Sequence, residues 1–169
     1  MTFAERLLLL LSRTPGGADY AESLSGYDEA ESSGSTSPLW LLQRVFPGFL
    51  GMISGKSVLD FGCGDGYQSV ALAAAGARQV LGVDANLDAL IRGRALAERS
   101  GFASIVQFSE EVPQELLGSF DVVISQNSME HFSKPSETVG VMLQAMSANG
   151  GLLITFGPPW FAPRGSHMH

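Results

Sequence analysis

The sequence contains little cysteine, few basic side chains and no long apolar run. Its one cysteine, Cys63, excludes a disulfide within the chain and is typical of a reducing compartment. Ten Lys and Arg against 17 Asp and Glu give a net charge of −7, which disfavours a broad nucleic-acid surface. The leucines at 7–11 are too few for a signal-peptide core, and no stretch is long enough to span a bilayer. We therefore expect a cytoplasmic protein without a membrane span.

The basic residues come closest to a cluster at Arg92, Arg94 and Arg99, which fall on one predicted helix. We interpret them as a solvated helix face, so nucleic acid is an unexpected partner. A chain of 169 residues is long enough for one domain with its own hydrophobic core. Nothing in the sequence indicates an oligomeric state.

The most informative segment joins an apolar strand to a helix through a glycine-rich turn. The strand is predicted over 57–61, glycines follow at 62, 64 and 66, and a helix is predicted over 67–75. Glycine has no Cβ and tolerates positive φ, so a ligand can approach this backbone closely. Asp84 lies 18 residues beyond Gly66, at the end of the next apolar run, where a carboxylate meets ribose hydroxyls in a doubly wound sheet. The pattern predicts a site for a nucleoside cofactor.

The glycine spacing distinguishes between cofactors. A dinucleotide fold uses G-x-G-x-x-G to hold a pyrophosphate, whereas this chain has D-x-G-x-G-x-G with Asp60 ahead of the first glycine. A carboxylate at the strand tip would repel a pyrophosphate and attract an ammonium group. A nicotinamide dehydrogenase and a tight turn without any ligand are the weaker alternatives.

Residues 58–66, V-L-D-F-G-C-G-D-G, resemble the first motif of the class I S-adenosylmethionine-dependent methyltransferases. The resemblance continues through L-G-V-D-A-N at 81–86, G-S-F-D-V-V-I-S at 118–125, M-E-H-F at 129–132 and G-G-L-L-I-T at 150–155. It implies S-adenosyl-L-methionine as cofactor and methyl transfer to a small-molecule acceptor. A binding domain without turnover is the alternative, because the chain ends before the last two strands of that family.

The resemblance also implies roles for particular residues. Asp60 with Gly62 and Gly64 would hold the amino-acid part of the cofactor, Gly66 would complete that turn, and Asp84 would bind the ribose hydroxyls. Ala85 would flank Asp84, Glu110 would read the adenine amino group, and Gln126 would lie under the methionine part. His131 is either a general base or a histidine that orients its loop.

Two residue types receive a second interpretation. Cys63 could be a nucleophile because it is close to a helix start, but a small side chain packed behind the glycines is the favoured role. His167 and His169 lack ligand spacing with His131 and have no cysteine nearby, so no metal site is predicted. We interpret the tail as natural sequence, although 163–168 resembles a cloning scar.

Alternating strands and helices predict an α/β fold with a doubly wound, mainly parallel sheet in three layers. The resemblance implies that this sheet is a Rossmann-like methyltransferase core. Strands are expected at 57–61, 79–83, 104–108, 120–125 and 151–156, and helices at 67–75, 87–99 and 136–147, with a helical turn near 113–117. Helices are also expected within residues 2–12 and from Ser37 and Pro38 onward. Asn86 is expected to cap the helix at 87–99, and Asn149 with Gly150 to form a helix stop or turn. The Gly-Pro-Pro-Trp segment at 157–160 is a candidate lining of the acceptor pocket. Residues 1–50 are expected to form a helical and loop lead segment, and residues 51–169 the cofactor-binding core.

Overall fold

The computed structural model describes residues 37–156 of the chain. The predicted helix at the N-terminus, the Gly-Pro-Pro-Trp segment after the last strand, and the two C-terminal histidines lie outside the described residues. All predicted strands and the glycine-rich turn lie inside them.

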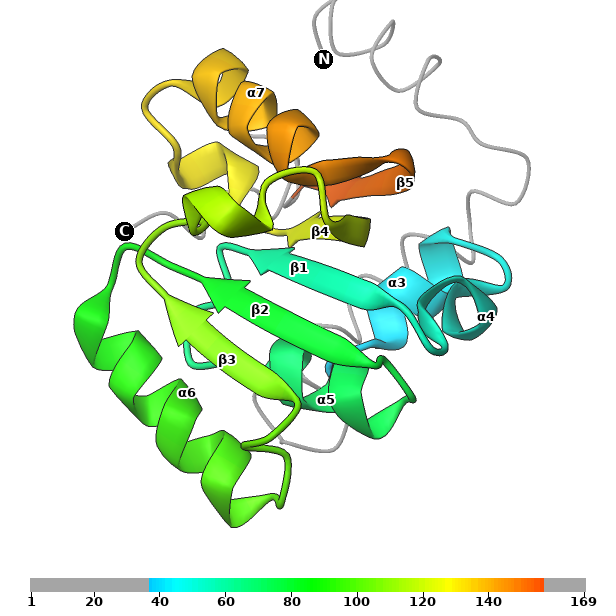
Figure 1. The fold of residues 1–169 in the computed structure, drawn as a ribbon, viewed down its shortest axis with the longest axis vertical. Coiled ribbons are helices and arrows are strands. Elements are labelled where there is room, and N and C mark those ends of the chain that lie inside the picture. The colour runs from blue at the N-terminus through cyan, green and yellow to red at the C-terminus, as the bar shows by residue number, and fades with distance from the viewer. Residues whose placement is uncertain (1–36, 157–169) are drawn as a thin grey trace, which may run out of the picture. The chain divides into compact units, whose positions relative to one another are not determined.

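Five parallel strands form one sheet in the described part of the chain, in the order β3-β2-β1-β4-β5. Figure 1 shows β1, β2 and β3 side by side with their arrowheads at the same edge. The strand order reverses between β1 and β4, so a crevice is expected beyond their carboxyl ends. The predicted α/β class with a doubly wound parallel sheet is confirmed. The strands are β1 (Ser57–Phe61), β2 (Gln79–Val83), β3 (Val106–Ser109), β4 (Phe120–Gln126) and β5 (Met146–Thr155).

Helices cover both faces of this sheet, as parallel strands joined by crossovers require. One buried cluster joins Val58, Val80 and Ile124 to α3, α4, α5 and α6, and another joins Leu59 and Val123 to α7. The helices are α3 (Trp40–Val45), α4 (Phe49–Ile53), α5 (Tyr67–Ala74), α6 (Leu87–Arg99) and α7 (Pro135–Ala145), with single 3₁₀ turns η1 (Gln114–Leu116) and η2 (Met129–His131).

Two predicted helix starts have different outcomes. Asn86 caps α6 as predicted, since its side chain accepts a hydrogen bond from the Ala89 amide at 3.2 Å. The helix expected to open at Ser37 and Pro38 begins only at Trp40, with Leu39 at the cap position and no side-chain cap. Leu39 is buried in the core, so packing rather than capping fixes this start.

The last strand is longer than the sequence predicts. Helix α7 ends at Ala145, and Gly150, expected in a turn, lies inside β5. A Cβ at Gly150 would stand 2.5 Å from Met146 Cγ and 2.9 Å from the carbonyl oxygen of Phe120. The glycine therefore permits close backbone contact where the β4–β5 register shifts, between Phe120 and Val122.

Helices α3 and α4 pack on the sheet, although α3 and the first two residues of α4 fall in the predicted lead segment 1–50. Leu42, Phe49 and Ile53 are fully or nearly fully buried in the same cluster as the strands. Within residues 37–156, no helix has both the length and the apolar character needed to cross a membrane.

Candidate functional site

The glycine-rich turn, residues 62–66, is called the glycine loop below, and it follows the carboxyl end of β1. Its first two amides, of Gly62 and Cys63, both donate to the carbonyl oxygen of Val83 at 2.8 and 3.0 Å. The next amide, of Gly64, donates to Asp84 Oδ2 at 2.8 Å. The loop is therefore anchored to the end of β2 and to the first residue beyond it.

The three glycines of this loop are required for different reasons. A Cβ at Gly62 would lie 2.5 Å from Ser128 Cβ, and one at Gly66 would lie 2.6 Å from Phe108 Cζ. Gly64 has φ +50° but no heavy atom within 4 Å of the position a Cβ would take. Packing thus demands glycine at both ends of the loop, whereas the middle faces open space that a ligand can enter.

Asp84 stands beside that open space with both carboxylate oxygens oriented by the backbone. Its Oδ1 accepts from the amide of Asn86 at 2.9 Å, while its Oδ2 accepts from Gly64. The side chain is only partly buried. Each oxygen can accept a further hydrogen bond, so the carboxylate can receive a pair of vicinal hydroxyls.

A pocket of about 550 Å³ opens next to Asp84, beyond the ends of β2 and β3. It is lined by Ala85, Ser109, Glu110 and Glu111. The Asp84 amide donates to the carbonyl oxygen of Ser109 at 3.2 Å, which joins the two strand ends. Ala85 and Glu110 are the residues predicted to flank Asp84 and to contact the adenine, and both line this pocket.

Asp60 is buried rather than placed on the open edge. Its exposure is 1 %, and its two oxygens accept from Gln68 Nε2 at 2.7 Å and from Ser69 Oγ at 2.6 Å. Burial raises the pKa of Asp60 to about 6, against the lowering effect of these two donors, and Asp84 adds a smaller raising effect. The Asp60 carboxylate is thus held by two side chains of α5. Because it is buried, it would act on a ligand through its charge and not by direct contact.

The end of β4 lies beside the loop. Register pairs Asp60 with Ile124, so Gln126 comes next to the start of the glycine loop. The loop after β4 is fixed by Ser128, whose hydroxyl lies 2.6 Å from that of Ser125 and donates to the carbonyl oxygen of Phe61 at 3.2 Å. His131 is exposed in turn η2 of the same segment. The fold therefore brings Gly62, Gly64, Asp84 and Gln126 to one edge, with His131 on the connection that follows β4.

Two buried polar atoms at this edge have no hydrogen-bond partner among the described residues: Gln126 Oε1 and Thr155 Oγ1. Gln126 and Thr155 are paired in register on the neighbouring strands β4 and β5. The partnerless acceptors, the open middle of the glycine loop and the carboxylate of Asp84 fit an adenosyl amino acid, which carries hydroxyls, an ammonium group and a carboxylate.

Cys63 is buried behind the loop. Burial, together with the charges of Asp60 and Asp84, raises the pKa of its thiol. The thiolate needed by a nucleophile is therefore disfavoured, and the packing role agrees with the geometry. No group of three or more metal-binding side chains occurs among residues 37–156.

Several residues of the site have no recognisable signal in the sequence. Asp65 of the glycine loop pairs with Arg92 on α6, with Arg92 Nη2 to Asp65 Oδ1 at 2.7 Å. Ser128 supports the loop from below, and Phe108 packs against its last glycine. The sequence shows an acid in G-D-G and several arginines within 87–99. Nothing in it indicates that Asp65 pairs with Arg92.

Residues 53–157, more than half of the chain, match the family described as "Methyltransferase domain". A ribosomal protein L11 methyltransferase of Neisseria gonorrhoeae is 34% identical over 62% of this chain and 33% of that protein. A tRNA U34 carboxymethyltransferase of Alcanivorax borkumensis is 33% identical over 68% of this chain and 36% of that protein. A ubiquinone biosynthesis O-methyltransferase of Acinetobacter baumannii is 38% identical over 59% of this chain and 41% of that protein.

The fold agrees with a solved structure, the S-adenosylmethionine dependent methyltransferase from Mesorhizobium loti. The TM-score is 0.61 at 23% identity, covering 77% of this chain and 57% of that chain. The chain spans 33% to 41% of the length of the three relatives above.

Proposed function

Since the chain belongs to the class I S-adenosylmethionine-dependent methyltransferases, as the match over residues 53–157 establishes, we propose that it transfers a methyl group from S-adenosylmethionine to a small-molecule acceptor. The observation that carries the proposal is the pairing of an open Gly64 with the oriented carboxylate of Asp84. The bound cofactor would supply an electrophilic methyl group on a sulfonium. The acceptor's nucleophilic atom would bond to this methyl carbon as the S–CH3 bond breaks, and S-adenosylhomocysteine would leave. The protein mainly has to align cofactor and acceptor and exclude water.

The proposed contacts follow the geometry of the edge. Asp84 would bind the ribose hydroxyls, and Gly62 and Gly64 would face the amino-acid part. Ala85 and Glu110, which line the adjoining pocket, would contact the adenine end. Gln126, whose Oε1 has no partner among the described residues, would lie against the methionine part.

Asp60 and Gly66 would act behind the ligand. The negative charge of Asp60 would favour a nearby cation without touching it, because the side chain is 1% exposed and is held by donors of α5. Gly66 is the N-cap residue of α5. Its φ of +78° is a left-handed conformation that glycine adopts without strain, so the loop can turn into the helix there.

His131 would accept the proton that the acceptor loses. It is exposed on η2, directly after the strand that carries Gln126. The alternative is that the side chain only orients this connection. Replacing His131 by Gln separates the two, because a base mutant loses kcat and its dependence on pH, whereas an orienting residue mainly changes acceptor KM.

A small acceptor is favoured by the acidic chain and by the relative named for ubiquinone biosynthesis, an O-methyltransferase. The relatives named for tRNA and for a ribosomal protein make macromolecules the competing class. A cytoplasmic setting belongs to the same proposal and rests on the single thiol.

The deciding experiment combines calorimetry with a turnover assay. We expect S-adenosylmethionine and S-adenosylhomocysteine to bind, NAD not to bind, and S-adenosylhomocysteine to be released when a phenol, amine or carboxylic-acid acceptor is supplied. Binding without release for any acceptor would favour a domain that binds the cofactor without turnover. Absence of binding would overturn the proposal.

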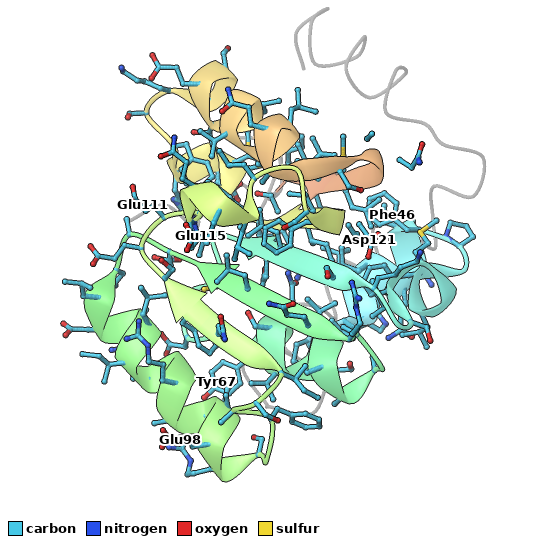
Figure 2. The ribbon with its side chains drawn as sticks, viewed as in Figure 1. Phe46, Tyr67, Glu98, Glu111, Glu115 and Asp121 are labelled. Carbon is cyan, nitrogen blue, oxygen red and sulfur yellow. The ribbon has the colours of Figure 1, made fainter. Side chains whose placement is uncertain are left out.

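Asp84→Ala should weaken cofactor binding by about 1–3 kcal/mol, because the ribose hydroxyls lose a charged acceptor. Glu98→Ala is the matched control, since Glu98 is an exposed acid on α6 (Figure 2) whose loss should leave the affinity unchanged. Equal affinity of the Asp84→Ala variant and the parent chain, measured by calorimetry, would contradict the placement of the ribose.

A further inference from the structure

The outer part of the glycine loop has fewer packing contacts than its base. Gly62 and Cys63 are held by Val83, but no heavy atom lies within 4 Å of the Cβ position of Gly64. Its amide is held only by the carboxylate of Asp84. The backbone that faces the ligand therefore depends on polar contacts for its position.

Asp65 supplies one more contact, to a helix that follows Asp84 in the chain. Arg92 Nε donates to Asp65 Oδ2 at 3.0 Å, and Arg92 Nη2 donates to Asp65 Oδ1 at 2.7 Å. This two-pronged geometry fixes the orientation of both planes, which a single contact does not. The same hydrogen bond lowers the pKa of the Asp65 carboxyl, so the pair stays charged at neutral pH.

Arg92 is carried on a helix whose position is tied to the ribose side of the site. Helix α6 begins directly after its cap residue Asn86, and the amide of Asn86 binds Asp84. The ion pair thus connects Asp65, the residue after Gly64, to helix α6, whose cap residue Asn86 also binds Asp84. Two contacts therefore hold the backbone around Gly64: the hydrogen bond from its own amide to Asp84, and the ion pair between its neighbour Asp65 and Arg92.

Such an exposed pair contributes little to global stability. The side chains of Arg92 and Asp65 are 55% and 39% exposed, and pairs of this kind are screened by water and salt. Its effect is expected instead on the local position of the loop, where the Gly64 amide bonds to Asp84 and the Gly66 amide closes the turn on the carbonyl oxygen of Cys63 at 3.0 Å.

We propose that the Asp65–Arg92 ion pair is a latch that holds the Gly64 amide on Asp84 and so sets the affinity for the cofactor. The latch rests on the proposed function for its ligand, but its effect on the loop is a property of the ligand-free protein. Both residues act by positioning, because they hold the binding backbone in place and do not touch the reacting atoms.

The first measurement needs no ligand. Exchange of the Gly64 amide hydrogen is followed by NMR in the parent chain and in the variants Asp65→Asn, Arg92→Gln and Asp65→Asn/Arg92→Gln. Opening of the latch should speed exchange at Gly64 about threefold to tenfold, while the thermal midpoint moves by no more than about 2 °C. Arg99→Gln and Glu98→Gln, on the far end of the same helix, should leave exchange at Gly64 unchanged.

The second measurement is the affinity for S-adenosylhomocysteine by calorimetry, with KM for S-adenosylmethionine and kcat where an acceptor is known. Each single variant should bind about threefold to tenfold more weakly. KM should rise while kcat stays constant, because in the variants the loop would be less ordered before the cofactor binds but equally ordered once it is bound. The double variant should be no weaker than either single one, since both remove the same contact.

Three outcomes overturn the latch: unchanged Gly64 exchange in both single variants, unchanged affinity in a parent chain that does bind, or additive losses in the double variant. Additive losses would mean that Asp65 or Arg92 contacts the ligand directly. If the parent chain binds no S-adenosylhomocysteine, the proposed function fails instead, and the exchange measurement alone decides the latch.

Discussion

At the scale of single residues, Asp60 illustrates how a buried charge is tolerated in this fold. The carboxylate is almost fully removed from water, and two side-chain donors of α5 compensate only part of the desolvation. The remaining cost is a pKa of about 6, so the group takes up a proton within the range of ordinary buffers.

This pKa predicts how stability changes with pH. The folded pKa of about 6 exceeds the unfolded value of 3.8, so the folded chain binds the proton more tightly between these values. The stabilisation is therefore present in full below pH 3.8 and is lost as pH rises through about 6. Between pH 5 and pH 8, Asp60 should lower the free energy of unfolding by about 1.4 kcal/mol.

Urea unfolding at several pH values tests this, with Asp60→Asn as the comparison. The difference in free energy of unfolding between parent and variant should change by about that amount from pH 5 to pH 8. A difference that stays constant across this range would mean that the Asp60 carboxyl is not perturbed.

Thr155 leads to a second prediction at this scale. Thr155 is 7% exposed, and its buried hydroxyl has no partner among residues 37–156, so within this part of the chain its hydrogen bond to water is not replaced. Thr155→Val, which keeps the shape, should raise the free energy of unfolding by about 1 kcal/mol in ligand-free protein. Ser125→Ala is the contrasting variant, because it removes a satisfied buried bond to Ser128 and should lower stability. Destabilisation by Thr155→Val would show that the Thr155 hydroxyl has a hydrogen-bond partner in the folded chain.

Single residues also mark the limit of what the sequence could predict at the site. Gly64 and Asp84 were identifiable as candidates because close approach of a ligand to backbone favours glycine, and an acid at a strand end suits ribose hydroxyls; the structure joins the two by a hydrogen bond. Asp65 and Ser128 were not, because their partners lie 27 and 67 residues away in the chain. An acid in a loop can pair with any arginine until the fold decides which one is near.

At the scale of elements, the loop, β2 and α6 meet on a single aromatic ring. Phe108 on β3 lies where Cβ atoms at Gly66, Gly82 and Gly93 would intrude, at 2.6, 2.7 and 2.9 Å. The three glycines form a cavity for this ring, which couples the edge strand to the glycine loop.

Gly82→Ala should therefore overpack this region and destabilise the fold by about 1–3 kcal/mol. Thermal or urea unfolding measures the change, and Phe108→Leu in the same chain should restore part of it. Gly51→Ala is the control, because Gly51 lies in helix α4 with no heavy atom within 4 Å of its Cβ position. That substitution should be neutral or stabilising by up to about 1 kcal/mol. A neutral Gly82→Ala would show that Phe108 moves aside at no cost.

The elements themselves were predictable where the signal is local. Strands β1 and β2 have the predicted bounds, since apolar runs between turn residues set them. The start of β5 was not, because Asn149 and Gly150 read as a turn in the sequence. Contact between Gly150 and the backbone of β4, which no local pattern encodes, keeps them in the strand.

At the scale of the whole molecule, the net charge gives a test of the proposed small-molecule acceptor. The chain has a net charge of −7 with only ten basic residues. Two of the three arginines on α6 are already engaged, Arg92 with Asp65 and Arg94 with the carbonyl oxygen of Phe108 at 2.9 Å. Two members of the nearest approach to a basic cluster are thus bound by groups of the protein itself. Asp121, labelled in Figure 2, lies near the start of β4 and likewise binds Arg78 and accepts from the Ser57 amide.

We expect this chain to bind mixed tRNA no more tightly than about 100 µM at 150 mM salt, because it cannot neutralise a run of phosphates. Fluorescence anisotropy with labelled tRNA measures this, and the titration is repeated at 50 mM salt, where phosphate contacts strengthen steeply. Micromolar binding with a steep salt dependence would place nucleic acid among the acceptors and would require a basic surface from outside residues 37–156. Weak binding at both salt concentrations, together with methylation of a small phenol or acid, would instead support a small acceptor. A small acceptor needs contacts only at the edge that holds Asp84, so the net charge of −7 does not exclude it.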